Sequence, residues 1–301
     1  MVTLELFYRV IDSVPKMLFW LDQRLKGTSL FSNSAKSDSD STPYTKFVSN
    51  VNQKDRIFKR FRRNYSYRVI LEHVSYKIGK SYLNLLSPET LNSYRENPKL
   101  IELGLIGKPR KFYYAKVGWI SPTILRYLYV NQNLSKIFSF KEIEKMSEIG
   151  VGFGGQIAVT MELNNIKSYS MYDLPPVLEL SRKVLAGIGI SMSRVTSKAI
   201  DPLTQNTYDL VISNYAFSEL PHAIQAEYVS KILSNARCGY LTMNSGRTNN
   251  SGRSEGKMSL TELMALLPNA EVVEEDPLTG PDNYLIVWGH KQYRKVGLSD
   301  G

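Results

Sequence analysis

A run of glycines near the middle of the chain is the feature of the sequence best suited to holding a ligand. Residues 148–156 read EIGVGFGGQ, between a short apolar run and a helical pattern. Glycine permits a tight turn and lets the backbone come close to a ligand, and the N–H groups that open a helix favour an anionic group. Gly150, Gly152 and Gly155 also satisfy the dinucleotide pattern G-x-G-x-x-G. The segment predicts a nucleotide site, and it leaves open a dinucleotide site or a turn with only a structural role.

Polar residues at the ends of the following strands extend this predicted site. Asp173 ends the strand after the glycine run, where a carboxylate can accept hydrogen bonds from ribose hydroxyls. Asp201 lies near the end of the third strand, and it either meets an adenine amino group or forms a turn before Pro202. Asn214 ends the fourth strand, at the edge of the sheet that faces a ligand crevice.

Short apolar runs alternate with helical patterns after about residue 140, which is typical of βα units and a mostly parallel sheet. No helical pattern separates the last two strands, so we expect them to pair antiparallel. Strands are expected at residues 145–149, 168–172, 193–199, 208–213, 240–244, 271–275 and 284–290, and helices at 156–164, 175–187, 221–236 and 259–267.

The residues before 140 are expected to form a helical lobe. Apolar residues recur every three or four positions from 46 to 86, and a second helical pattern covers 121–138. The segment 27–45 is rich in Ser and Asp, which favours a flexible linker. The expected regions are an amphipathic helical arm (1–26), a flexible linker (27–45), a basic substrate or cap lobe (46–140) and an α/β domain (141–301).

The chain has a net charge of +10, and the positive charge is concentrated in its first half. Residues 1–147 carry 25 Lys and Arg against 12 Asp and Glu, whereas residues 148–301 carry 13 against 16. In the basic segment 54–68, cations alternate with Phe and Tyr. This pattern suits the phosphates of a nucleotide- or lipid-linked sugar, an anionic membrane or a nucleic acid, and it also suits the solvated face of a helix.

Other features concern the compartment. The single cysteine, Cys238, excludes an internal disulfide and is expected to be buried in a strand. Charged residues interrupt the apolar residues of 1–25, so we expect neither a secretion signal nor a membrane span and place the protein in the cytoplasm, with peripheral contact to a membrane as an alternative.

Residues 141–291 resemble the class I S-adenosylmethionine-dependent methyltransferases. The resemblance rests on Glu148-x-Gly150-x-Gly152-x-Gly154, on Asp173, on Tyr208-Asp209-Leu210-Val211 and on the C-terminal strand pair. More narrowly, the chain is similar to sugar O-methyltransferases associated with bacterial surface polysaccharides. The matching segments are Asp173-Leu174-Pro175-Pro176, residues 213–220 (SNYAFSEL) and Asp282-Asn283-Tyr284.

The resemblance implies an α/β fold: a Rossmann-like seven-stranded sheet with an antiparallel C-terminal strand, preceded by a helical N-terminal lobe. It also implies S-adenosyl-L-methionine as cofactor. Gly150, Gly152 and Gly154 would line its methionine part and Glu148 would orient the amino-acid end. Asp173 would hold the ribose, Leu174 would pack on adenine, Asp201 would bind the adenine amino group, and Asn214 would complete the contacts.

The implied acceptor is a sugar hydroxyl, which is a poor nucleophile while protonated, so we expect a general base. His222 follows the fourth strand and is the first candidate, and Glu219 is its rival; both also suit the start of a helix. Tyr215, Asn244 and Arg247 are expected to bind the substrate, the last two from the polar loop after the fifth strand.

Other functions stay open on the same residues. An N-methyltransferase of nucleic acids or small molecules is one, although residues 214–217 read NYAF and lack the two prolines of the Asn-Pro-Pro-Tyr segment of many N-methylating relatives. An NAD-binding oxidoreductase and a binding protein without catalysis are the others. No cluster of His, Cys and Asp has metal-ligand spacing, so no metal is implied, and scattered carboxylates leave a divalent ion open.

Overall fold

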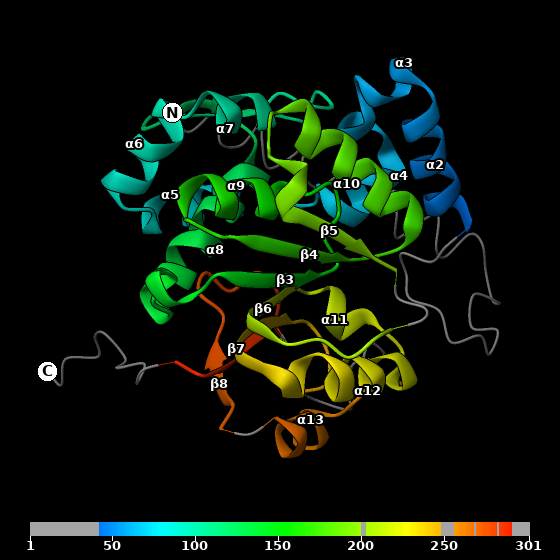
Figure 1. Cartoon of the computed structure of the whole chain (residues 1–301). Helices are drawn as coiled ribbons and strands as arrows, with labels where there is room; N and C mark the ends of the chain where they lie inside the picture. Colours follow the sequence, from blue (N-terminus) through cyan, green and yellow to red (C-terminus); the bar gives the residue numbers. More distant parts are fainter. Residues whose placement is uncertain (1–41, 200–202, 248–255, 268, 282, 291–301) are drawn as a thin grey trace, which may run out of the picture.

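Figure 1 shows the chain as a computed structural model in which residues 42–199, 203–247, 256–267, 269–281 and 283–290 are described. Some expectations lie outside these residues: the amphipathic arm 1–26, most of the linker, Asp201 and the part of the polar loop beyond Arg247.

A seven-stranded sheet in the order β5-β4-β3-β6-β7-β9-β8 forms the centre of the molecule. The five strands β3 to β7 run parallel, and β9 lies antiparallel between β7 and β8. The predicted Rossmann-like seven-stranded sheet with an antiparallel C-terminal strand is thus confirmed. The strands are β3 (Lys145–Ile149), β4 (Ser168–Tyr172), β5 (Val195–Lys198), β6 (Tyr208–Asn214), β7 (Ala236–Met243), β8 (Glu271–Glu274) and β9 (Tyr284–Trp288).

Helices that follow the strands of this sheet begin where the sequence provides a start signal. Two prolines open α10, where the missing N–H groups leave no helical hydrogen bond unmade. The Ser259 hydroxyl accepts the Glu262 N–H at the start of α13 (3.2 Å). Three of the predicted helices are confirmed, as α9 (Gly155–Leu163), α10 (Pro175–Gly187) and α13 (Leu260–Leu266), and a short α11 (Ala216–Glu219) precedes α12. The helix expected at 221–236 is shorter in the structure: α12 (His222–Lys231) is followed by the 3-10 helix η5 (Leu233–Asn235), and β7 begins at Ala236, four residues before the expected strand.

The long helical pattern at 46–86 is broken in the structure, which corrects the sequence-based expectation. The side chains of Asn64 and Ser75 accept the N–H groups of Tyr67 and Ile78, so each starts a new helix. The pieces are α2 (Thr42–Gln53), α3 (Asp55–Phe58), the 3-10 helix η2 (Phe61–Arg63), α4 (Tyr65–Leu71) and α5 (Tyr76–Leu85). Helix α2 also begins inside the segment expected to be linker.

Two further helices and a hairpin lead to α8 (Pro122–Ile137), which confirms the pattern at 121–138. The helices α6 (Pro88–Glu96) and α7 (Pro98–Leu103) each begin with a proline after a capping side chain, Ser87 and Asn97. Strands β1 (Phe112–Tyr114) and β2 (Gly118–Ile120) pair antiparallel, a hairpin that the sequence did not indicate.

One apolar core joins the helices before residue 140 to the sheet. Phe61 is fully buried, and its ring lies 6.1 Å from that of Phe153 in the glycine loop. Arg62, inside the predicted basic face, is also fully buried; it pairs with Glu72 at 2.5 Å, and its guanidinium lies 4.4 Å from the centre of the Phe153 ring. In Figure 1 helices α2 to α4, in blue, lie beside α10, and α5 to α7 lie on the other side of the upper half, while α11 to α13 lie at the lower end.

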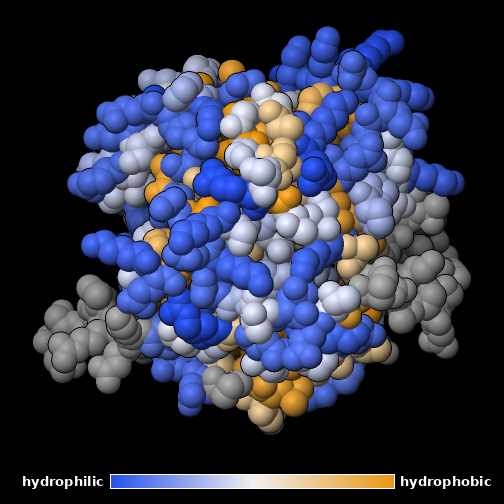
Figure 2. Space-filling view, in the orientation of Figure 1, coloured by the Kyte–Doolittle hydropathy of each residue, from blue (hydrophilic) through white to orange (hydrophobic). Residues whose placement is uncertain are grey.

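The described surface seen in Figure 2 is largely hydrophilic, and apolar residues show both in its upper half and at its lower end. Leu266 of α13 is among the exposed apolar residues. Within the described ranges, no helix is both long enough and apolar enough to cross a membrane. Cys238 is buried in β7, as expected.

Candidate functional site

The glycine loop between β3 and α9 has a backbone that only glycine adopts readily. Gly150, Gly152 and Gly154 have φ angles of 81°, 54° and 83°. A Cβ at Gly150 would also lie 1.9 Å from the Cβ of Ala216. Because β6 ends next to β3, this close approach brings the loop against the start of α11. The glycines therefore set the shape of the loop through both φ and packing.

Asp173 ties the glycine loop to the end of the neighbouring strand β4. One carboxylate oxygen accepts the Gly152 N–H at 3.2 Å, and the other accepts the Leu174 N–H at 2.7 Å. Leu174 is half-buried at the residue before α10. An ionised carboxylate can accept several hydrogen bonds at once, which is the property needed to bind ligand hydroxyls as well as these N–H groups.

Glu148 lies at the base of the loop and is almost completely buried, with 2% of its surface exposed. Burial raises its pKa to about 8, against hydrogen bonds that favour the ionised form. Those bonds come from the Tyr169 hydroxyl (3.2 Å) and the Asn214 amide (3.4 Å). No described Lys, Arg or His lies within 4 Å to form an ion pair with it. The site thus holds a carboxyl group that a cationic ligand would help to ionise.

The described cofactor residues predicted from sequence therefore come together at the carboxyl ends of three adjacent strands, β4, β3 and β6. Strand order reverses here, because β3 continues to β4 on one side and β6 pairs on its other side. In open α/β sheets, ligands bind at this reversal. The residues brought together are Glu148, Gly150, Gly152, Gly154, Asp173, Leu174 and Asn214.

Tyr215 is held by the C-terminal segment and lines a small cavity. Its φ is 69°, unusual for a residue with a side chain, and its hydroxyl bonds to Glu275 and, at 2.9 Å, to Thr279. The cavity, about 20 Å³, is also lined by Asn214, Tyr82 and Arg126. Tyr215 thus lies between the glycine loop and the residues after β8.

Glu219 and Asn244 meet at the ends of β6 and β7. The Asn244 amide donates to Glu219 at 3.0 Å, and its oxygen accepts the Ser218 hydroxyl at 2.7 Å. The Ser218 hydroxyl also lies 2.6 Å from the Tyr215 carbonyl oxygen, and its single proton goes to one of these two acceptors at a time. These polar contacts connect Glu219 to the residue that follows Asn214.

The other two predicted residues have surface partners. His222 is exposed at the start of α12, and its Nε2 lies 2.8 Å from Glu262 of α13. Arg247 makes two hydrogen bonds to Glu274 at the end of β8, 3.0 and 2.5 Å long. The described structure does not bring either into the cluster of Glu148, Asp173 and Asn214.

Arg126 and Glu275 belong to the site and were missed by sequence reasoning. Glu275 is 8% exposed and accepts from Tyr215 and Thr279. Arg126 lies within α8, where the pattern 121–138 predicted only a helix. A single arginine in an apolar helical stretch was the one signal for it.

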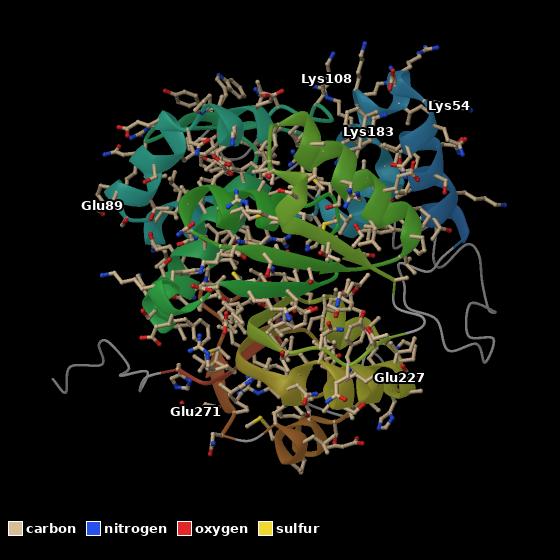
Figure 3. The ribbon with its side chains drawn as sticks, viewed as in Figure 1. Lys54, Glu89, Lys108, Lys183, Glu227 and Glu271 are labelled. Atoms are coloured by element: carbon tan, nitrogen blue, oxygen red, sulfur yellow. The ribbon has the colours of Figure 1, made fainter. Side chains whose placement is uncertain are left out.

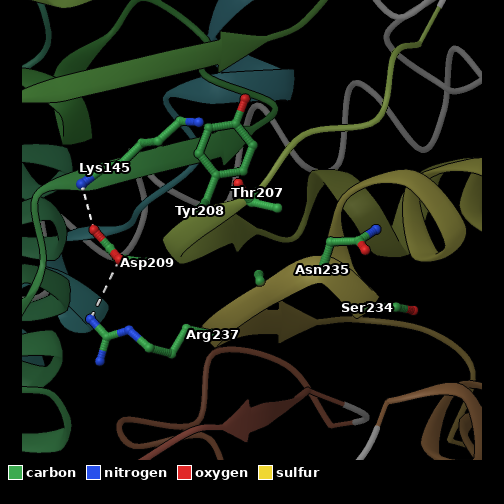
Figure 4. A pocket seen from close by; sticks show the side chains of 8 residues that line it. Lys145, Thr207, Tyr208, Asp209, Ser234, Asn235 and Arg237 are labelled. Atoms are coloured by element: carbon green, nitrogen blue, oxygen red, sulfur yellow. Dashed lines mark hydrogen bonds and ion pairs between the residues drawn. The ribbon is translucent and has the colours of Figure 1, made fainter.

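A second concave region lies at the amino ends of β3, β6 and β7, on the opposite edge of the sheet. It encloses about 360 Å³ and is lined by Lys145, Tyr208, Asp209 and Arg237 among others (Figure 4). Asp209 accepts the N–H groups of Lys145 and Glu144 at 2.8 and 2.9 Å. The Asp209 carboxylate also lies 3.6 Å from Arg237, which argues for a structural role of this carboxylate.

Comparisons with known proteins give similarity in fold. No family model matches the chain, and no curated protein matches it. The chain is similar to mitomycin 7-O-methyltransferase MmcR, with 13% identity and a TM-score of 0.39 over 83% of this chain and 68% of that one. It is also similar to a protein of Nostoc punctiforme PCC 73102 assigned as an O-methyltransferase, with 16% identity and a TM-score of 0.41 over 71% and 73%. PigF with SAH matches at 14% identity and a TM-score of 0.39, over 52% and 60%. Similarity at this level carries no argument about activity or substrate.

Proposed function

We propose that this chain is an S-adenosylmethionine-dependent O-methyltransferase that methylates a sugar hydroxyl of a surface polysaccharide or its precursor. One observation carries the proposal: Asp173, the glycine loop and the Glu148–Asn214 pair converge where the strand order of the sheet reverses. This is the place where a nucleoside ligand binds in such sheets.

The residues of the loop fit a nucleoside that carries an amino-acid end. Asp173 would accept hydrogen bonds from ribose hydroxyls, and Leu174 would contact adenine. Glu148 is buried without an ion-pair partner among the described residues, so a ligand ammonium would stabilise its ionised form. When bound, the cofactor supplies an electrophilic methyl group on a sulfonium. The work left to this chain is alignment of the acceptor oxygen and exclusion of water.

The acceptor hydroxyl must lose its proton, and the two candidate bases differ in their surroundings. Glu219 is half-buried and linked through Asn244 and Ser218 to Tyr215. His222 is exposed and engaged with Glu262. A base needs to reach the hydroxyl within about 3 Å, which favours Glu219 on this geometry.

Exposed cations of the N-terminal helices supply a surface for an anionic carrier. Lys54 and Lys108 project from one corner of the molecule, near Lys183 (Figure 3). Arg63 donates to the Lys108 carbonyl at 3.1 Å, so the basic segment and the loop before β1 adjoin. We infer that a pyrophosphate carrier or an anionic glycan binds here, in the cytoplasm or at a membrane surface, rather than a nucleic acid.

Transfer of a tritiated methyl group from S-adenosylmethionine tests the proposal. Purified protein is incubated with nucleotide-linked sugars, with surface polysaccharide and with RNA, and labelled products are analysed by mass spectrometry. We expect label in a glycan as an alkali-stable methyl ether. Label in RNA alone, or on nitrogen, would contradict the assigned acceptor.

Variants of the two base candidates refine the same assay. Glu219→Gln is expected to lower kcat by about 100-fold or more, because proton removal contributes about 10²–10⁴ to such steps. His222→Gln is expected to leave kcat within about threefold, since its partner lies on the surface. The reverse pattern would assign the base to His222.

A further inference from the structure

Arg126 of helix α8 is a charged group buried beside the candidate site. Only 8% of its surface is exposed, and its Nε has no hydrogen-bond partner. Aromatic rings surround it: its guanidinium carbon lies 5.4 Å from the centre of the Tyr127 ring and 5.9 Å from that of Tyr215. Arginine stays protonated in proteins. A cation is therefore held in this part of the core.

The guanidinium lacks an anionic partner of its own. No described Asp or Glu forms an ion pair with it, and Glu275, which lines the same cavity, is occupied by Tyr215 and Thr279. A buried charge without a counter-charge is costly to keep. A guanidinium with free N–H groups is the group best shaped to bind a carboxylate through two parallel hydrogen bonds.

Asn214 connects the cavity next to Arg126 with the buried carboxyl group of Glu148. Asn214 lines that cavity together with Arg126, and its amide donates a hydrogen bond to the Glu148 carboxyl group at 3.4 Å. Arg126 and Glu148 interact electrostatically, yet they form no ion pair with each other. The cavity, about 20 Å³, has room for one water-sized group, which suits a terminal group and not a whole sugar.

We propose that Arg126 binds the carboxylate of the cofactor's amino-acid end while Glu148 binds its ammonium. This inference rests on the proposed function. A buried guanidinium and a buried carboxyl group, neither with an ion-pair partner among the described residues, are complementary to an α-amino acid zwitterion, because the ligand ammonium would favour the ionised form of Glu148. A carboxylate on the acceptor would satisfy Arg126 alone and leave Glu148 without a cation, so the observations favour the cofactor.

Calorimetry with three nucleosides tests Arg126 directly. The ligands are S-adenosylhomocysteine, its analogue without the carboxylate, and 5′-methylthioadenosine, which lacks the whole amino-acid end. Wild type is expected to bind S-adenosylhomocysteine about 10- to 100-fold more tightly than the decarboxylated analogue, the range for lost charged hydrogen bonds. This arm needs no variant and is independent of any folding defect.

Variants then assign that difference to one side chain. Arg126→Met is expected to lose the same 10- to 100-fold for S-adenosylhomocysteine and to bind the other two ligands within about threefold of wild type. The affinity of Arg126→Lys for S-adenosylhomocysteine is expected to lie between those of wild type and Arg126→Met, because an ammonium cannot form the paired hydrogen bonds. Arg56→Met, at an exposed arginine of α3, is the matched control and is expected to change nothing.

The outcomes separate the two proposals. If wild type binds S-adenosylhomocysteine and its decarboxylated analogue equally, or if Arg126→Met weakens all three ligands alike, the role of Arg126 is overturned and the proposed function stands. An unchanged affinity of Arg126→Met for S-adenosylhomocysteine overturns it too and assigns the guanidinium to an acceptor anion. If wild type binds none of the three, the proposed function falls, and this inference with it.

Discussion

Ionisable residues at the two edges of the parallel sheet differ in whether they have ion-pair partners. At the carboxyl ends, Glu148 and Arg126 are buried, and neither has an ion-pair partner among the described residues. At the amino ends, Asp209 accepts two backbone N–H groups, and Arg237 lies 3.6 Å from it (Figure 4). The concave region of about 360 Å³ lies at the second edge, where Asp209 and Arg237 form an ion pair with each other.

This difference separates a binding edge from a structural edge. Burial would raise the pKa of Asp209, yet the N–H groups of Lys145 and Glu144 and the charge of Arg237 together lower it below its usual value. Burial instead raises the pKa of Glu148 to about 8. Unmatched buried charge costs stability, and a ligand that supplies the missing charges would recover that cost. Substitutions at the two edges should therefore have different effects on stability and on binding.

The largest effect is expected at Gly150. A Cβ there would lie 1.9 Å from Ala216, and the φ of 81° disfavours any side chain. Gly150→Ala should lower the free energy of unfolding by about 3 kcal/mol and abolish binding of S-adenosylhomocysteine. Gly118→Ala, with φ 77° and no atom within 4 Å, is the control and should cost only about 1 kcal/mol. Urea unfolding measures both; equal losses would show that the contact with Ala216 is not tight.

Glu148→Gln should remove a dependence on pH. The pKa of Glu148 in the folded protein, about 8, lies above the unfolded value of 4.5, so the carboxyl stabilises the fold at low pH and loses that contribution as pH rises through 8. Arg126, Asp173, Tyr169 and Asn214 are the groups that face it. The Tm of the ligand-free wild type should thus fall by a few degrees relative to Glu148→Gln between about pH 6 and pH 8.

Ligand binding gives the second readout for the same variant. Because an ammonium favours the ionised carboxylate, wild type should release up to one proton per S-adenosylhomocysteine bound at about pH 7. Calorimetry in buffers of different ionisation enthalpy measures that release. Glu148→Gln should release none. Proton release that persists in Glu148→Gln would assign the titration to another group.

Asp209→Ala is expected to have the smallest effect, and on stability alone. Loss of its hydrogen bonds should lower the free energy of unfolding by about 1 kcal/mol at pH 7. The pKa of Asp209 is depressed in the folded protein, so this contribution is present at neutral pH and is lost as pH falls through the folded pKa. Urea unfolding at two pH values checks the sign. A loss of S-adenosylhomocysteine affinity would show that the two edges are coupled.

Much of the sheet could be predicted from the sequence because parallel strands buried on both faces are continuous apolar runs. The segment 208–213 contains the apolar run Leu210-Val211-Ile212, and β6 extends the expected strand by a single residue, Asn214. The helical pattern at 46–86 gave the type of structure but not its breaks, since Asn64 and Ser75 also occur inside helices. Their capping role depends on the backbone around them.

The site was predictable to the extent that it follows the strand ends. Glycines and acids at those ends are visible in the sequence, and the described ones come together. The burial of Arg126 is not visible, because it depends on how α8 packs against Tyr127 and Tyr215. Glu219 and His222 both follow β6 closely in the sequence, so their positions in the sequence did not show which of them is near the site. In the structure Glu219 ends α11 and His222 begins α12, which places them in different surroundings.

The affinities of S-adenosylhomocysteine and of the dinucleotide NAD⁺ test most directly whether the glycine loop accepts a sulfonium nucleoside. Calorimetry compares S-adenosylhomocysteine and NAD⁺ on wild type, on Asp173→Ala and on Asp209→Ala. We predict that wild type binds S-adenosylhomocysteine at least about 100-fold more tightly than NAD⁺, that Asp173→Ala loses about 10- to 100-fold of this affinity, and that Asp209→Ala keeps it. Binding of NAD⁺ in preference, or equal binding by Asp173→Ala and wild type, would contradict the assignment of this site.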